Sequence, residues 1–368
     1  MYTLIGTPYL GKHFVLRQGS TQGLQIPTGR FDELRRAAGA DRYVPDWLAS
    51  AARRQWGIDV AGRALAGTVL VRPDTPYGYS RASYELNLGC NYDCEHCYLG
   101  LKRFEGLDWP GRETLLRTMR DAGVVWLQLT GGEPLVDRLF AQVYAYAYDL
   151  GMLLTISTNG SRLWRDDIID LLVARPVYKL TISVYGATAA GYDAVTRRPG
   201  SFQKFAKGLA AAVDAGLPMS LNLVVTHSNA HELDGMKALA EGFGLPYHVY
   251  SNISPTIYGG AEVLRSQDPA YLRRRKPFTG CNAGHTFFHA DPFGRASICK
   301  VGRDPSIPLL EEGVEGLRRL GGIADRLLGR QGGCTGCTLQ GTCGTCMPLV
   351  QLYRKANADL RTYCQHGN

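Results

Sequence analysis

Short apolar runs alternate along this chain with stretches in which apolar residues recur every three or four positions. From residue 84 onward, runs rich in β-branched, aromatic or leucine residues predict strands at 84–88, 124–129, 153–157, 179–184, 220–225 and 247–250. The stretches of helical period predict helices at 112–122, 135–150, 165–173, 201–215 and 232–243. This alternation is typical of βα units and a parallel sheet, so we expect an α/β fold built on a partial (β/α)6 TIM-like barrel. An open doubly wound sheet is the alternative, and both place the chemistry at the carboxyl ends of the strands.

The two ends of the chain lack this rhythm. Strands are predicted at 2–5, 13–17 and 24–26 and helices at 31–38 and 45–56, which indicates a small α+β module. The last hundred residues are rich in Gly, Cys, Pro and Arg and poor in periodic apolar residues, so we expect metal centres, not a conventional core, to hold them together. The predicted domains are therefore 1–75, 76–265 and 266–368.

Composition adds the cysteines to this picture. The 368 residues are 45% hydrophobic and 20% charged, as in a soluble globular protein, and no apolar run approaches the ~20 residues that span a membrane. No secretory signal is seen, so we expect a cytoplasmic protein whose ten cysteines bind metal or perform redox chemistry. The net charge of +8 is mild and its densest run is 273–276, which is thin evidence for nucleic acid but leaves an acidic peptide partner open.

Three cysteines, Cys90, Cys94 and Cys97, form a CX3CX2C motif directly after the first strand of the repeats. Three thiolates can hold three irons of a four-iron cluster and leave the fourth iron open to another ligand. A structural zinc knuckle is the alternative. Zinc sites usually add a second CX2C pair, however, and the next cysteine is Cys281.

Further motifs follow successive strands, and their order resembles that of the radical S-adenosylmethionine (SAM) enzymes. The residues concerned are Gly131, Gly132, Glu133 and Pro134 after the second strand, Ser157, Thr158 and Asn159 after the third, Ser183 at the end of the fourth, Arg197, Val224 and His96. The resemblance implies that Glu133 meets the SAM amino group and that Arg197 pairs with its carboxylate, with Arg198 as the competing assignment. A zwitterionic ligand needs such an anion and cation.

The same resemblance assigns the remaining motifs. Ser157, Thr158, Asn159 and Ser183 would contact ribose and carboxylate, although an ordinary turn with a helix cap would explain the first three equally well. The strand around Val224 would pass backbone groups to adenine. His96 would pack against adenine, or it is simply a satisfied histidine.

The later cysteines read CX12GX4C at Cys281 and Cys299, then CX2CX5CX2C, and resemble the SPASM extension of these enzymes. This implies one auxiliary cluster on Cys281, Cys299 and Cys346 and a second on Cys334, Cys337, Cys343 and Cys364. The family pattern ends in CX3C where this chain has CX2C, which leaves the register at Cys346 open. Interleaved zinc sites are the alternative.

The first auxiliary cluster lacks a fourth cysteine because Phe287 occupies the position that some members give to it. Either His285, His289 or Asp291 completes the cluster, or one iron stays open. Asp291 could also serve as the catalytic proton acceptor, although a solvated turn aspartate explains it equally well.

The resemblance thus implies three [4Fe-4S] clusters and SAM, which is cleaved to a 5′-deoxyadenosyl radical. We expect a maturase that installs an oxidative C–C or thioether crosslink in a ribosomally made (RiPP) precursor peptide. The leader of that peptide would bind residues 1–75, unless these residues only cap the barrel. An electron donor such as flavodoxin or ferredoxin would supply electrons to the maturase. The alternatives are a dehydrogenase of a small alcohol, carbohydrate or protein Ser/Cys residue, a peptide epimerase, and a zinc-binding interaction protein.

Overall fold

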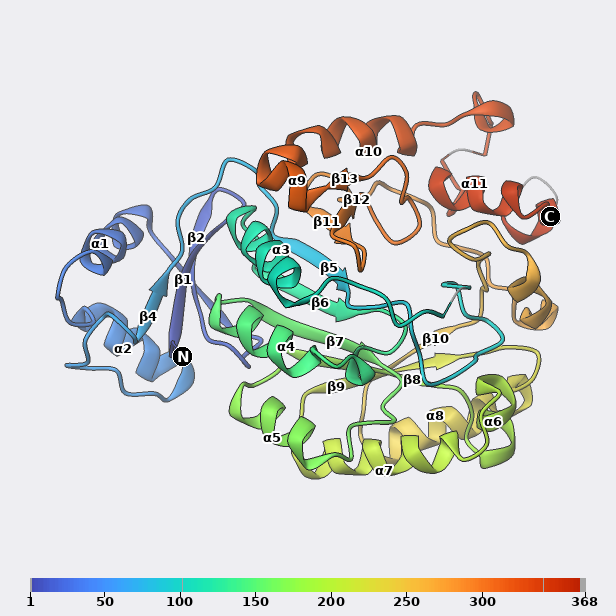
Figure 1. The fold of residues 1–368 in the computed structure, drawn as a ribbon, viewed down its shortest axis with the longest axis horizontal. Helices are drawn as coiled ribbons and strands as arrows, with labels where there is room; N and C mark the ends of the chain where they lie inside the picture. Colours follow the sequence, from blue (N-terminus) through green and yellow to red (C-terminus); the bar gives the residue numbers. More distant parts are fainter. Residues whose placement is uncertain (1, 101, 340, 365–368) are drawn as a thin grey trace.

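Two β-sheets organise the protein, which is described here by a computed structural model covering residues 2–100, 102–339 and 341–364. The smaller sheet has the strand order β3-β2-β1-β4 and the larger one the order β10-β9-β8-β7-β6-β5-β11-β12-β13. Figure 1 shows the small sheet at the amino-terminal end of the chain, the large sheet in the centre and the carboxyl-terminal segment folded over it.

The amino-terminal module contains the strands and helices that the sequence predicts, with slightly shifted ends. They are β1 (Leu4–Tyr9), β2 (Lys12–Leu16), β3 (Gly23–Ile26), α1 (Thr28–Ala38) and α2 (Asp46–Trp56). A fourth strand, β4 (Val69–Val71), was not predicted, because three residues are too few to show a period; it pairs in parallel with β1. The module has its own core, in which Phe31, Leu34 and Leu48 are fully buried.

The large sheet contains six parallel strands in consecutive order: β5 (Arg81–Glu85), β6 (Trp126–Thr130), β7 (Leu153–Thr158), β8 (Lys179–Val184), β9 (Met219–Val224) and β10 (Tyr247–Tyr250). A doubly wound sheet reverses its strand order at a switch point. No reversal occurs among these six strands, so the doubly wound alternative is wrong. β8 and β10 have the bounds predicted, whereas β5 ends earlier because residues 86–88 already lead into the cysteine loop.

Helices connect these strands, and Figure 1 shows α5, α7 and α8 along one side of the sheet. The α-helices of this region are α3 (Trp109–Asp121), α4 (Phe140–Asp149), α5 (Asp166–Ala174), α6 (Ala189–Thr196), α7 (Ser201–Asp214) and α8 (Leu233–Gly242). Only α6 was not predicted. Short 3-10 turns of the chain are η1 (Pro134–Val136), η2 (Ala230–Glu232), η3 (Glu262–Ser266), η4 (Pro269–Tyr271), η5 (Gly313–Arg319), η6 (Gly332–Cys334) and η7 (Leu360–Thr362).

The carboxyl-terminal segment extends the large sheet. Its elements are β11 (Phe287–Ala290), β12 (Arg295–Ser297), β13 (Ile307–Pro308), α9 (Leu309–Glu312), α10 (Leu320–Leu328) and α11 (Met347–Lys355). β11 pairs in parallel with β5, so that His289 lies opposite Ser83. The strands of the carboxyl-terminal segment thus lie beside β5, the first strand of the βα repeats.

The expectation that this segment lacks a conventional core is wrong for its first half. Phe288, Ile298, Ile307 and Leu320 are fully buried in the main core, since the short strands pack their apolar side chains against β5 and its neighbours. Strands of two to four residues leave no readable period in the sequence. Only the Gly- and Cys-rich remainder relies on a small separate cluster, which contains Met347, Val350, Tyr353 and Tyr363.

The amino-terminal module packs against the amino ends of the central strands. Ile5 and Leu16 of the module form one apolar cluster with Val125 and Leu153, which precede β6 and begin β7. Gln18 Nε2 donates to the carbonyl oxygens of Tyr148 and Met152 at 2.7 and 2.9 Å. The arrows of the central strands in Figure 1 point away from the module, so their carboxyl ends lie on the opposite side. No helix among the described residues has both the length and the apolar character needed to cross a membrane.

Candidate active site

A cavity of about 470 Å³ lies at the carboxyl ends of the central strands. Ten residues singled out from the sequence line it: Cys90, Cys94, His96, Cys97, Gly131, Gly132, Ser157, Thr158, Asn159 and Ser183. They come from the cysteine loop after β5 and from the ends of β6, β7 and β8. Consecutive parallel strands end at one edge of a sheet, which is why motifs far apart in the sequence meet here.

The two glycines hold the cysteine loop against the end of β6. Gly132 N–H donates to Asn87 O at 2.9 Å, and Glu133 N–H donates to Gly89 O at the same distance. A Cβ atom on Gly132 would lie 2.0 Å from Gly89 O, and one on Gly131, whose φ is +144°, would lie 2.4 Å from Asn87 O. Only glycine permits this close approach of two backbones.

Glu133 is buried beneath the cavity and does not line it. Its Oε1 accepts hydrogen bonds from the Thr158 hydroxyl at 2.6 Å and from Leu135 N–H at 3.0 Å, and Oε2 accepts from Asn159 N–H at 2.7 Å. Burial raises the pKa of this carboxyl group to about 7, against the opposing effect of the three donors. The side chain therefore ties two motifs together, and its predicted contact with SAM stays a prediction.

The cysteine loop is anchored on several sides. Asn159 Nδ2 donates to Asn91 Oδ1 at 3.0 Å and lies 3.9 Å from Cys90 Sγ, which links the third-strand motif to the loop. Burial raises the pKa of the Cys90 thiol to about 12, and a bound iron is the kind of positive charge that offsets such a shift. Three cysteine side chains on one loop, facing one cavity, fit a cluster with an open iron.

His96 also faces the cavity, and its ring centre lies 5.3 Å from that of Tyr185. Burial lowers the pKa of His96 to about 4, so the ring is neutral at pH 7. Its Nδ1 is buried and has no hydrogen-bond partner among the described residues. A flat, neutral ring at this position suits a stacking contact with an aromatic ligand.

Three other residues singled out from the sequence lie away from the cavity. Arg197 lines a neighbouring cavity of about 380 Å³ that shares Cys94, Cys97 and Lys102 with the first one. The carbonyl oxygen of Val224 accepts from Asn229 Nδ2 at 2.8 Å. Pro134 is buried at the start of η1. The structure thus does not bring the expected pair of charges, Glu133 and Arg197, into the cavity.

Asp291 occupies the tight turn between β11 and β12. Its Oδ1 accepts hydrogen bonds from the N–H groups of Phe293 and Arg295, both at 2.9 Å, and it does not line the cavity. This is the arrangement of a turn aspartate. The geometry gives no support to the role of proton acceptor.

Several lining residues were missed in the sequence. They include Gln128, Tyr250 and Lys300, together with the side chain of Asn222, whose strand was singled out only for its backbone groups. Gln128 and Asn222 are polar residues inside otherwise apolar strands, and period-2 alternation could have indicated that they face inward. Lys300 follows Cys299, and its Nζ donates to Thr130 Oγ1 at 3.4 Å, a contact between the carboxyl-terminal segment and β6 that no local pattern indicates.

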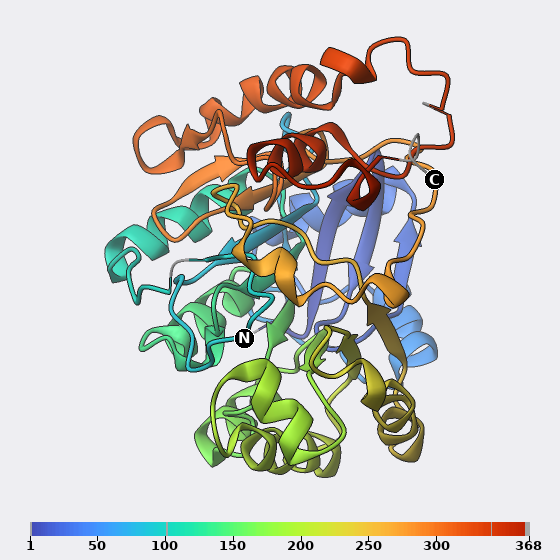
Figure 2. The same ribbon diagram turned by 90° about the vertical axis from the view of Figure 1, so that its right-hand side faces the viewer.

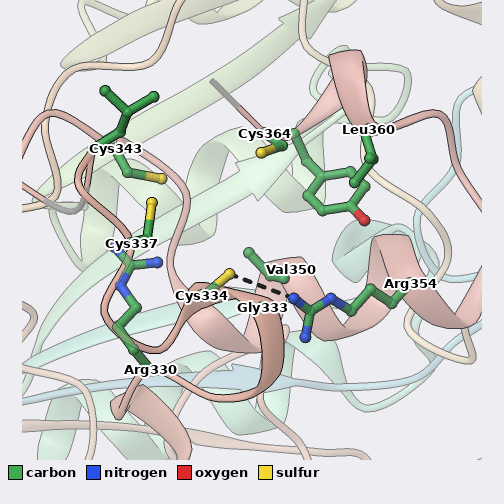
Figure 3. A pocket seen from close by; sticks show the side chains of 11 residues that line it. Arg330, Gly333, Cys334, Cys337, Cys343, Val350, Arg354, Leu360 and Cys364 are labelled. Atoms are coloured by element: carbon green, nitrogen blue, oxygen red, sulfur yellow. Dashed lines mark hydrogen bonds between the residues drawn. The ribbon is translucent and has the colours of Figure 1, made fainter. Parts of the chain in front are cut away.

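Four later cysteines surround a second cavity of about 280 Å³. Cys334, Cys337, Cys343 and Cys364 line it together, and Figure 3 shows their side chains around this space. Arg354 Nη2 donates to Cys334 Sγ at 3.4 Å. The structure thereby brings the predicted quartet together, including Cys364, which is isolated in the sequence.

The remaining predicted triad is Cys281, Cys299 and Cys346. Burial raises the pKa of the Cys346 thiol, and the charges of Cys299 and Cys281 raise it further. The Sγ of Cys299 accepts from Gly302 N–H at 3.1 Å. No three His, Cys, Asp or Glu side chains in the described ranges are grouped so as to hold a single metal ion.

The candidate fourth ligands of this triad are engaged elsewhere. His285 Nε2 lies 3.0 Å from Asp325 Oδ1. His289 is fully buried, with Nδ1 2.7 Å from Ser83 Oγ. Asp291 caps its own turn.

The buried carboxylate of Glu85 links the first cysteine loop to the segment that follows Cys299. Arg303 Nη1 and Nη2 donate to the Glu85 carboxylate at 2.9 and 2.7 Å, and Tyr98 Oη lies 3.4 Å from Oε1. Burial opposes the charge of Glu85, but the neighbouring His289 and the hydrogen bonds from Arg303 hold the pKa of this carboxyl group well below its usual value. Tyr98 follows Cys97 and Arg303 follows Cys299 by four residues, so Glu85 connects two cysteine segments.

Comparison with known proteins identifies the class of this site. Residues 84–240 match the Radical SAM superfamily. This match confirms the resemblance to radical SAM enzymes drawn from the sequence.

Among curated proteins, the chain is similar to the mycofactocin maturase MftC of Mycobacterium ulcerans, with 29% identity over 239 residues, 60% of this chain and 63% of the relative. It is also similar to the PqqA peptide cyclase of Xanthomonas euvesicatoria pv. vesicatoria, with 31% identity over 160 residues and 42% of each chain. The AdoMet-dependent heme synthase of Nitratidesulfovibrio vulgaris is 29% identical over 177 residues, 46% of this chain and 47% of the relative. The matched segments thus span about half the length of the curated relatives, and less than two thirds in each case.

Solved structures extend the likeness to the whole chain. SuiB of Streptococcus suis bound to the precursor peptide SuiA superposes with a TM-score of 0.61 and 13% identity, covering 99% of this chain and 98% of that one. The anSMEcpe structure with bound AdoMet gives a TM-score of 0.54 and 12% identity, covering 76% of this chain and 92% of that one. At these identities the likeness concerns the fold alone.

Proposed function

We propose that this chain is a radical SAM peptide maturase that installs an oxidative crosslink in a ribosomally made precursor peptide. The observation that carries the proposal is the cavity in which three cysteines meet the motifs that end β6, β7 and β8. The peptide-modifying relatives MftC and PqqA cyclase, and the fold shared with SuiB, support a peptide as substrate.

In this proposal Cys90, Cys94 and Cys97 bind a [4Fe-4S] cluster and the cavity beside them binds SAM. Together these groups supply reductive cleavage of SAM and abstraction of a substrate hydrogen. Ser157 and Asn159 offer short polar side chains to the ligand, and His96 offers its ring. Glu133 keeps the Asn159 loop in place from below, so it acts as a positioning residue.

The other seven cysteines bind two auxiliary [4Fe-4S] clusters in this proposal. The quartet around the second cavity provides four thiolates. The triad provides three, and the engagement of His285, His289 and Asp291 with other groups leaves one iron for a substrate donor. An oxidative crosslink requires that electrons leave the substrate, and auxiliary clusters are suited to accept them.

The amino-terminal module is proposed to bind the leader of the precursor. β3 (Gly23–Ile26) is an edge strand of its sheet, and an extended peptide can add to such an edge by main-chain hydrogen bonds. The module packs at the amino ends of β6 and β7, and the cavity lies at their carboxyl ends. The peptide must therefore run along the strands between the two sites.

The proposal is tested by anaerobic reconstitution with iron and sulfide, followed by incubation with SAM, a reductant and a candidate precursor peptide. Release of 5′-deoxyadenosine together with a peptide lighter by two hydrogens supports a crosslink or a dehydrogenation, which fragmentation then separates. A peptide whose mass is unchanged in ordinary water, but which gains one deuterium from a deuterated solvent, indicates epimerisation. A chain that binds zinc and cleaves no SAM would overturn the proposal.

A further inference from the structure

Four arginines gather beside the cysteine quartet. Arg273, Arg274, Arg275 and Arg361 line a cavity of about 240 Å³, which we call the basic pocket. Cys364 lines both this pocket and the cavity of the quartet. The sequence shows only the first three arginines as a run, and the fold adds the fourth from η7.

The charge of the basic pocket is left largely uncompensated. Arg275 is held in place because its guanidinium donates to Tyr353 Oη at 2.9 Å and to Thr362 O at 3.3 Å. The side chains of Arg273, Arg274 and Arg361 are exposed and form no ion pair with any described residue.

Exposed arginines elsewhere on the surface often have a carboxylate partner. Arg30 pairs with Glu33 at 2.9 Å, and Arg165 pairs with Asp167 at 2.8 Å. Near the basic pocket, Asp359 already accepts a hydrogen bond from the main-chain N–H of Arg361 at 2.8 Å. A patch of unpaired arginines attracts and orients an acidic surface during diffusional encounter.

We propose that the basic pocket is the docking site of an acidic one-electron carrier protein of the flavodoxin type. The inference rests on the proposed function, because it assigns the quartet beside the pocket to a [4Fe-4S] cluster. In the step, the reduced flavin of the carrier loses one electron and this cluster gains it. No bond is made or broken in this enzyme.

The position of the pocket favours a carrier protein over the leader peptide. The module proposed to bind the leader packs at the amino ends of the central strands, whereas the basic pocket is formed by residues 269–275 and 345–364. Figure 2 shows this carboxyl-terminal part of the chain on the face turned toward the viewer. A partner docked there would have the quartet as its nearest group of cysteines, since Cys364 belongs to both cavities.

The test compares the anaerobically reconstituted holoenzyme with the double variant Arg273→Glu/Arg274→Glu. The variant Arg53→Glu/Arg54→Glu on α2 is the matched control, because it changes the net charge equally at two adjacent exposed arginines. The affinity for flavodoxin is measured by calorimetry at low and high salt. Cluster reduction is followed by stopped-flow absorbance, with reduced flavodoxin and, separately, with dithionite.

We expect the double variant to bind flavodoxin at least about tenfold more weakly than the wild type, with a smaller dependence of the affinity on salt. Its reduction by flavodoxin should be slower by at least about the same factor. The double variant should be reduced by dithionite at the same rate as the wild type, which shows that its clusters and fold are intact. The control variant should behave like the wild type in both assays. A second variant, Arg361→Glu, should behave like the first.

Equal flavodoxin binding and reduction rates in wild type and double variant would overturn the proposal. The proposal would also be overturned if the enzyme did not bind flavodoxin but bound an acidic probe peptide tightly, and if the double variant lost that binding. Failure of the proposed function is seen separately, because a chain without auxiliary clusters would contain only about four irons whatever its affinity for flavodoxin.

Discussion

The carboxylate of Glu133 accepts a hydrogen bond from the Thr158 hydroxyl at 2.6 Å. These residues belong to motifs that follow different strands, β6 and β7. Together with the bond from Asn159 N–H, this contact makes the two motifs one polar unit beneath the cavity. The acidic residue of the second-strand motif therefore shapes the ligand site from behind.

Replacing Glu133 by Gln should lower the free energy of unfolding by about 1–3 kcal/mol. The Gln amide would turn an NH2 group toward groups that are themselves donors, so at least one of them would lose its acceptor. Thermal unfolding of the apoprotein measures this loss, and Thr158→Val serves as the companion variant. An unchanged midpoint for both variants would contradict the role given to this contact.

The stability contributed by Glu133 should also depend on pH. Burial raises the pKa of this group from 4.5 to about 7 in the folded chain, so the folded state retains a proton that the unfolded state releases in this range. The free energy of unfolding should therefore fall as pH rises from 4.5 to about 7. Subtracting the pH profile of Glu133→Gln from that of the wild type isolates this contribution. A difference that grows with pH would show that the sign is wrong.

Removing the side-chain amide of Asn159 should weaken SAM binding by about twofold to about tenfold, because one hydrogen bond contributes roughly 0.5–1.5 kcal/mol. Asn159→Ala is compared with Thr155→Ala, which lies on β7 but does not line the cavity. Calorimetry with SAM on the reconstituted enzyme gives both affinities. The same loss in both variants would mean that β7 was disturbed as a whole.

Iron content should distinguish the two interpretations of the cysteine triad. His285→Ala and Asp291→Ala are expected to retain the iron of the wild type, because their side chains are engaged with Asp325 and with the turn. Cys346→Ser should lose up to about four irons. If His285→Ala loses as much iron as Cys346→Ser, the histidine is a ligand.

The distance between the proposed leader site and the cavity should impose a minimum spacer on the precursor peptide. The path follows β7, whose six residues span about 20 Å at 3.3 Å per residue. Peptides with fewer than about six residues between leader and modified site should bind but remain unmodified. Binding and mass analysis of a spacer series test this, and modification at every length would contradict the arrangement.

The sequence predicts those parts of the fold that repeat. The six central strands follow from periodicity, which leaves their order in the sheet open, and the ten cavity residues follow from motifs near strand ends. The short strands β4 and β11–β13 carry too few residues for a period. β4 pairs with β1 and β11 pairs with β5, and β12 and β13 then extend the sheet from β11. The long-range pairings leave no local signal.

The residues of the site likewise divide into those that a local motif indicates and those that depend on long-range packing. Asn159 and His96 line the cavity, and both belong to motifs singled out from the sequence, whereas their contacts with SAM stay predictions. The inward face of Glu133, the separate cavity of Arg197 and the approach of Lys300 to Thr130 depend on how loops pack in three dimensions. Residue types alone do not encode these distances.

Release of 5′-deoxyadenosine is the direct product of the proposed radical SAM chemistry. The anaerobically reconstituted chain is incubated with SAM and dithionite, with Cys94→Ala as the control that removes one thiolate of the first loop. We expect the wild type to release the nucleoside and the variant to release none. A wild-type enzyme with a full complement of iron that releases no 5′-deoxyadenosine, or a variant that releases as much, would contradict the proposed chemistry.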